Sequence, residues 1–146
     1  MGAGESELVT RLNKHFDRKH IQAFAYRQPQ VMRRAQKCDI TVDSQKPEWF
    51  LAIEVKSRMG HCALNFMHDF QQEDDRKEHQ LVRLCKFADK TGRTPIVYYV
   101  CRGAGKGGKN LYYSFDAYAL LEHMNDGNQS IYAKDLSNWN ISWFDT

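Results

Sequence analysis

The fold of this chain is decided by one stretch, WFLAIEVK at residues 49–56, in which six of the eight residues are apolar. Successive side chains of a strand point to opposite faces, and here both faces carry apolar residues as far as position 53. A strand with this pattern has to be buried on both sides. The stretch therefore predicts a central strand covered by helices, which is an α/β arrangement. Its two polar residues, Glu54 and Lys56, are two positions apart and share one face.

The sequence on either side of this strand predicts the remaining elements. Apolar residues recur at helical spacing in 5–16 and in 81–88, where Gly92 is expected to end the helix. Shorter apolar runs predict strands at 21–27, 38–42, 96–101 and 111–114, and a helix at 117–123. Residues 28–37 and 103–108 are basic and are expected to be loops. Residues 57–75 are expected to be irregular and to end in an acidic helix start at Gln71–Asp75.

Length and composition predict a single domain spanning residues 1–146. The chain is 42% hydrophobic and 27% charged, which suffices for one core and argues against disorder. No stretch approaches the roughly 20 apolar residues of a membrane span, and the N-terminus lacks the features of a signal peptide. The four cysteines form no CxxC pair, so we expect reduced thiols and a cytoplasmic location. The formal net charge of +3 permits nucleic-acid binding without requiring it.

Asp39 and Glu54 form the candidate chemical centre. They lie on adjacent predicted strands, so their carboxylates are expected to converge. Two carboxylates about 4 Å apart repel by roughly 4 kcal/mol at an effective dielectric constant of 20, unless a cation lies between them. Magnesium, which prefers oxygen ligands, suits such a pair. Lys56 is placed to position an attacking water or to stabilise the charge that develops on a phosphate.

An aspartate, a turn and then Glu-x-Lys at the end of an apolar strand form the signature of the PD-(D/E)xK nucleases. Over residues 5 to about 121 the chain resembles the archaeal Holliday-junction resolvases of the Hjc type. The matching parts are the helix at 5–9, the basic Arg27, CDI at 38–40, LAIEVK at 51–56, and the helix and strand from 83 to 97. Cys38 replaces the proline that names the motif, and the segments 28–37 and 57–80 are longer than in the cellular resolvases.

The resemblance implies a restriction-endonuclease-like fold, in which α-helices flank a central mixed β-sheet. It implies a catalytic set made of Glu5, Asp39, Glu54 and Lys56. It also implies a Mg²⁺ ion, replaceable by Mn²⁺, that is bound by Asp39, Glu54 and the backbone carbonyl of Val55. A symmetric four-way junction requires two matched nicks, so a homodimer is expected.

Helical phase favours Glu5 over Glu7 as the fourth catalytic residue. At 100° per residue Glu5 lies within the apolar arc of the first helix, whereas Glu7 lies nearly opposite and faces water. The alternative interpretation is that Glu5 is an N-terminal acid favoured by the helix dipole. Gln80, at the start of the second helix, is a possible accessory residue near the metal.

The segment that precedes Asp39 carries four cations that are predicted to bind DNA phosphates: Arg27, Arg33, Arg34 and Lys37. The alternative is an ordinary solvated loop. For Glu54 and Lys56 the alternative is a surface ion pair at a strand end. Residues 103–108 lack the Lys-Ser/Thr of a P-loop, which argues against nucleotide hydrolysis.

The resulting hypothesis is a structure-specific endonuclease that resolves Holliday junctions by paired, metal-dependent phosphodiester hydrolysis. Two alternatives remain open. One is another PD-(D/E)xK endonuclease, restriction-like or a phage repair enzyme, that cuts branched or single-stranded DNA. The other is a catalytically silent DNA-binding module, against which the intact Asp39, Glu54 and Lys56 argue.

Overall fold

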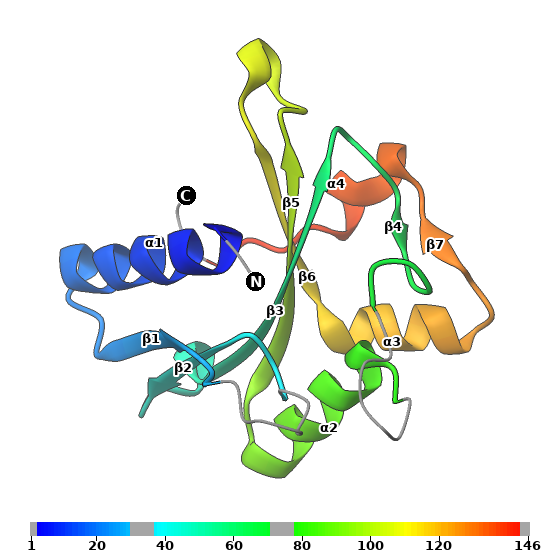
Figure 1. Ribbon diagram of the computed structural model, residues 1–146. Coiled ribbons are helices and arrows are strands. Elements are labelled where there is room, and N and C mark those ends of the chain that lie inside the picture. Colours follow the sequence, from blue (N-terminus) through cyan, green and yellow to red (C-terminus); the bar gives the residue numbers. More distant parts are fainter. Residues whose placement is uncertain (1–2, 30–36, 71–77, 144–146) are drawn as a thin grey trace.

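One mixed β-sheet organises the protein (Figure 1), and the computed structural model describes residues 3–29, 37–70 and 78–143. Five strands follow in the order β1 (Ala23–Arg27), β2 (Ile40–Ser44), β3 (Leu51–Met59), β5 (Thr94–Arg102) and β6 (Leu111–Asp116). β3 and β5 are parallel, whereas the other neighbouring pairs are antiparallel. The prediction of an α/β fold with a central mixed sheet is confirmed.

Helices cover both faces of this sheet, as Figure 1 shows. They are α1 (Ala3–Lys19), α2 (Gln80–Thr91), α3 (Ala117–Asn125) and the short α4 (Leu136–Trp139). Leu12 of α1 and Ile53 of β3 belong to one buried apolar cluster, on one face. Leu84 of α2, Leu120 of α3 and Ala52 of β3 belong to a second cluster, on the other face. The central strand is therefore buried on both sides, as the stretch 49–56 predicts.

Short elements that the sequence did not predict complete the described structure. β4 (Leu64–Asn65) and β7 (Ser130–Ile131) form a two-stranded antiparallel sheet. Three single turns of 3-10 helix are η1 (Pro47–Trp49), η2 (Lys106–Gly108) and η3 (Ala133–Asp135). Two-residue strands have no periodicity that a sequence pattern can detect, because only the pairing between distant segments makes them strands. In the described part of the chain, no helix is both long and apolar enough to cross a membrane.

The strand boundaries differ from the prediction, most clearly at β3. This strand continues to Met59, whereas the irregular segment was expected to start at Ser57. The reason is tertiary, since β5 lies parallel to β3 and pairs with it through the register Met59↔Arg102. At its other end, Trp49 belongs to η1 and not to the strand. The acidic helix start predicted at Gln71–Asp75 lies outside the described residues.

Both ends of α2 are capped, which fixes the helix that carries Gln80. Nδ1 of His79 accepts a hydrogen bond from the backbone N–H of Leu81 at 3.1 Å, so His79 is the N-cap. At the other end, Gly92 adopts a φ of 78° and its N–H donates to the carbonyl of Ala88 at 2.8 Å. The predicted end at Gly92 and the predicted start at Gln80 are thus confirmed.

Candidate active site

Asp39 lies where the pairing of β2 with β3 ends. Its backbone N–H donates to the carbonyl of Ile53 at 3.0 Å, and its carboxylate accepts the backbone N–H of Val55 at 2.8 Å. The carboxylate therefore occupies the place that a backbone carbonyl would take if the ladder continued. This bond holds Asp39 beside β3 at the level of Glu54 and Lys56.

Glu54 points to the face of β3 that α2 covers, because Ala52, two residues earlier, belongs to the cluster on that face. Only 5% of Glu54 is exposed. Burial, and after it the charge of Asp39, raise the pKa of Glu54 from 4.5 to about 8, against the opposing effect of Lys56. A hydrogen bond with Asp39 acts in the same upward direction. The two carboxyls are thus close together, and the single ammonium beside them does not offset the cost of ionising both.

Lys56 is held by contacts with three residues. Its Nζ lies 3.1 Å from Oε2 of Glu54 and donates to Oε1 of Gln80 at 2.5 Å. It also lies 5.5 Å from the centre of the Phe70 ring. The side chains of Lys56 and Glu54 are 16% and 7% exposed, so this is not a surface ion pair. The structure brings Gln80, predicted as an accessory residue, directly to Lys56.

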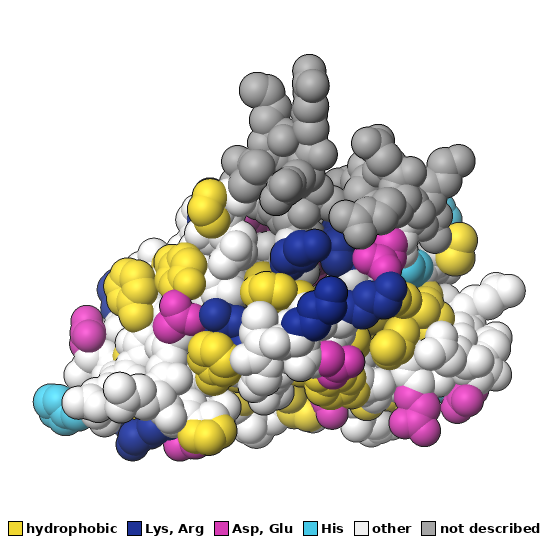
Figure 2. Space-filling view, turned by 90° about the horizontal axis from the view of Figure 1, so that it is seen from below, with side chains coloured by type: hydrophobic (Ala, Val, Ile, Leu, Met, Phe, Trp, Pro, Cys, Tyr) yellow, Lys and Arg dark blue, Asp and Glu magenta, His cyan; other side chains and the backbone are white. Residues whose placement is uncertain are grey.

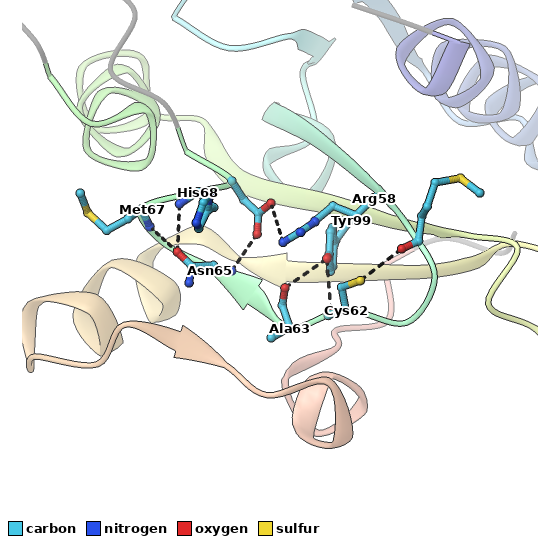
Figure 3. A network of polar contacts seen from close by, with 9 residues as sticks. Arg58, Cys62, Ala63, Asn65, Met67, His68 and Tyr99 are labelled. Carbon is cyan, nitrogen blue, oxygen red and sulfur yellow. Dashed lines mark hydrogen bonds and ion pairs between the residues drawn. The ribbon is translucent and has the colours of Figure 1, made fainter.

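The segment that ends at Phe70 is fastened to the sheet by a polar network (Figure 3). Tyr99 of β5 donates its hydroxyl hydrogen towards two backbone carbonyls of this segment, at 3.2 and 3.3 Å. Asp69 forms an ion pair with Arg58 of β3 at 3.7 Å and accepts a backbone N–H of the segment at 2.7 Å. Since Phe70 follows Asp69, the network fixes the aromatic wall against which Lys56 lies.

Two further residues lie beside the site: His79, for which the sequence favoured a surface or structural role and not metal binding, and Arg83, which the sequence did not single out. The imidazole of His79 bridges two segments, because Nδ1 accepts from the first turn of α2 and Nε2 donates to the carbonyl of Phe66 at 2.7 Å. Burial lowers the pKa of His79, and the charges of Lys56 and Arg83 lower it as well. Arg83 is buried and lies three residues after Gln80, on the same side of α2. The signal that could have identified Arg83 is its position beside the apolar stripe of the helix, next to Leu84.

Glu5 belongs to α1, which packs on the face of the sheet opposite to the one that Glu54 faces. Its side chain is 13% exposed and lies 3.1 Å from Arg27, whereas Glu7 is 49% exposed. The prediction from helical phase that Glu5 is more buried than Glu7 is therefore confirmed. A Cβ on Gly4 would lie 3.5 Å from the Val55 side chain, so the first turn of α1 packs against β3 here. Glu5 lies beside Arg27 at the end of β1. β1 pairs with β2, and Asp39 directly precedes β2.

The donors at this site fit a hard divalent cation such as Mg²⁺. Asp39 and Glu54 supply carboxylate oxygens. The carbonyl of Val55 points to the same edge of β3 as its N–H, which donates to Asp39, because both groups of a strand residue project to one side. Among the described residues there is no group of three or more His, Cys, Asp or Glu side chains that could hold a metal ion. Mg²⁺ needs only one or two carboxylates because it retains several waters.

The cations predicted to bind DNA are only partly described. Lys37 is exposed and precedes Asp39 by two residues, and Arg27 is 42% exposed beside Glu5. Arg33 and Arg34 lie outside the described residues. Figure 2 shows Lys and Arg side chains gathered near the middle of the face seen from below. α2 lies at that end of the molecule in Figure 1.

A scan against protein-family models and a search of the curated proteins returned no match to this chain. The resemblance to the resolvases therefore stays a prediction. Function is inferred from the geometry around Asp39, Glu54 and Lys56.

Proposed function

We propose that this protein is a divalent-metal-dependent DNA endonuclease that cuts branched DNA, with the four-way junction as its substrate. The observation that carries the proposal is the pair of Asp39 and Glu54 carboxyls, held together where β2 begins beside β3, next to the buried Lys56. Two such carboxyls are costly in a protein interior unless a cation accompanies them. A function that recruits a cation explains why the pair is present.

Each residue of the site has a place in phosphodiester hydrolysis. Asp39, Glu54 and the carbonyl of Val55 would hold the ion. A bound divalent ion polarises a phosphate oxygen and lowers the pKa of a water bound to it. Lys56, directed by Glu54 and Gln80, is positioned to donate hydrogen bonds to the attacking water or to a phosphate oxygen.

The sequence resemblance supports the four-way junction as the substrate, and the symmetry of that substrate supports a homodimer. Two nicks placed symmetrically on a junction require two active sites related by a twofold axis. Light scattering on the purified chain tests the assembly. A twofold molecular mass is expected, and a monomer at every concentration that supports cleavage would overturn the dimer.

A nicking assay tests the activity itself. A labelled synthetic four-way junction and a linear duplex of the same sequence are incubated with the full chain, in Mg²⁺ or in EDTA. We expect paired nicks in the junction with Mg²⁺ and none in EDTA. The absence of cleavage of any branched DNA overturns the proposal, and equal cutting of linear duplex favours another nuclease of the same superfamily.

Matched variants link the activity to the site. Asp39→Ala removes one carboxylate and is expected to lower the cleavage rate by about 10³-fold or more, since charge stabilisation supplies a large part of such catalysis. Asp17→Ala removes an exposed carboxylate of α1 and is expected to leave the rate unchanged. Equal rates for the two variants would place the chemistry elsewhere.

A further inference from the structure

The hairpin of β5 and β6 extends beyond the rest of the sheet (Figure 1). Its last paired residues are Cys101 and Leu111, and residues 102–110 between them include three cations and no acidic residue. The cations are Arg102, Lys106 and Lys109, and all three are exposed. In the part of the chain that the structure describes, none of them is in an ion pair.

We infer that this turn is a second DNA-binding element, which contacts backbone phosphates of one duplex arm of the branched substrate. The inference rests on the proposed function and deepens it, because it assigns part of the substrate to a surface outside the active site. None of the matching parts that carry the resemblance in the sequence lies in residues 102–110.

The turn has a defined shape that brings its backbone to the surface. The N–H of Gly105 donates to the carbonyl of Lys109 at 2.6 Å, and the N–H of Gly103 donates to Oδ1 of Asn110 at 2.9 Å. A Cβ at Gly105 would lie 2.8 Å from the carbonyl oxygen of Lys109, so this close approach requires glycine. The glycines leave Lys106 and Lys109 as the long side chains of the tip.

The chemistry of the turn fits a polyanion better than a protein partner. Protein interfaces depend on apolar and aromatic anchors. Ala104 is the sole apolar residue in 102–110, and it packs against the protein's own core. Lysine and arginine side chains are the groups that hold DNA phosphates. The turn offers three such cations in nine residues.

The register of the sheet places these cations within reach of the same DNA arm as the active site. β3 and β5 pair Lys56 with Tyr99 and Met59 with Arg102. Three residues of strand span about 10 Å, so Arg102 lies about 10 Å along the sheet from the level of Lys56. The tip lies further in the same direction. One turn of duplex DNA is about 34 Å long, so these cations face phosphates within roughly one turn of the phosphate that is cut.

The salt dependence of binding tests this inference. The variant Arg102→Ser/Lys106→Ser/Lys109→Ser is compared with the wild type on a labelled four-way junction, in EDTA so that no strand is cut. Each lost phosphate contact reduces the slope of log affinity against log salt by about 0.9, so a decrease of about 2.7 is expected. The affinity ratio of wild type to variant is then about 40 times larger at 50 mM than at 200 mM salt.

Two further variants separate local contacts from total charge and from folding. Arg18→Ser/Lys19→Ser/Lys46→Ser makes the same change in formal charge, from +3 to 0, near the opposite end of the sheet. This variant is expected to keep the wild-type slope. The charge-conserving Arg102→Lys/Lys106→Arg/Lys109→Arg is also expected to keep it. Equal slopes for the two serine variants overturn the inference, and so does a weakened slope in the charge-conserving one.

The failure of this inference is distinguishable from the failure of the proposed function. If the wild type cuts junctions and the serine turn variant keeps the wild-type slope, DNA binding by the turn is refuted and the proposed function is not. If the wild type binds junctions and never cuts them, the proposed nuclease activity is refuted. A reduced slope in the turn variant would still support DNA binding by the turn. At saturating protein, single-turnover cleavage by the turn variant is expected to stay within about twofold of wild type, because Asp39, Glu54 and Lys56 are unchanged.

Discussion

Replacing Glu54 by glutamine is expected to stabilise the metal-free protein while it abolishes cleavage. Burial, and after it the charge of Asp39, raise the pKa of Glu54 to about 8 from 4.5. The folded chain therefore keeps a proton that the unfolded chain releases. The free energy of unfolding falls as pH rises from about 4.5 to about 8. Glutamine has nearly the same shape and no charge, so it removes this loss.

The size of the effect follows from the two pKa values. Linkage between them lowers the free energy of unfolding, relative to low pH, by about 1 kcal/mol at pH 5, about 3 kcal/mol at pH 7 and about 5 kcal/mol at pH 9. The stability advantage of Glu54→Gln is thus expected to grow by about 4 kcal/mol between pH 5 and pH 9. At about 3 °C per kcal/mol, this corresponds to a Tm difference that widens by roughly 12 °C. Lys56 retains its hydrogen bond to Gln80 in the variant.

Urea and thermal unfolding in EDTA at pH 5, 7 and 9 measure this difference. Glu48→Gln, at an exposed carboxylate of η1, is the control and is expected to follow the wild type at every pH. Added Mg²⁺ is expected to stabilise the wild type by about 2.7 kcal/mol at 100 times Kd, and the variant by less. A difference between wild type and Glu54→Gln that stays constant with pH would refute the reasoning.

Three further substitutions have defined outcomes. Lys56→Met is expected to lower the junction-cleavage rate by about 10²-fold or more with little change in DNA affinity, and an unchanged rate would remove Lys56 from the chemistry. Burial lowers the pKa of His79 from its ordinary value of 6.5, so the unfolded chain binds a proton more readily and the free energy of unfolding falls as pH drops below 6.5. Protonation of the folded imidazole then removes the N-cap. His79→Asn should keep a cap and remove this part of the acid loss in a pH series of Tm. Arg93→Met loses an ion pair of 2.8 Å to Asp43 and hydrogen bonds of 3.1 and 3.3 Å to two strand carbonyls, so urea denaturation should show a loss of about 2 to 3 kcal/mol. A loss below about 0.5 kcal/mol would mean that water replaces these contacts.

Much of the fold was predictable because buried faces of helices and strands produce a periodic pattern of apolar residues in the sequence. The stretch 49–56 is apolar on both faces, and the structure indeed covers β3 with α1 on one side and α2 and α3 on the other. Gly92 marked the end of α2 because a left-handed residue there suits glycine. By contrast, the extension of β3 to Met59 depends on backbone hydrogen bonds to β5, and these do not depend on the pattern of side chains.

The sequence predicted that Asp39 and Glu54 converge beside Lys56, and it did not predict how deeply these side chains are buried. Asp39, Glu54 and Lys56 were identifiable because an aspartate followed by Glu-x-Lys at the end of an apolar strand matches a known signature. Their burial depends on side chains from distant parts of the chain. Phe70 covers Lys56 only because Tyr99 and Asp69 fasten its segment to the sheet.

The sequence by itself determined which residues make up the candidate site and which strand presents Glu54 and Lys56, because strand alternation is a local property of the chain. Tertiary structure alone decided that Asp39 accepts the N–H of Val55 and that Gln80 meets Lys56. It also decided that the pKa of Glu54 rises to about 8. These properties depend on desolvation and on charges brought together across 15 or more positions of sequence, and no local pattern records the distance between such groups.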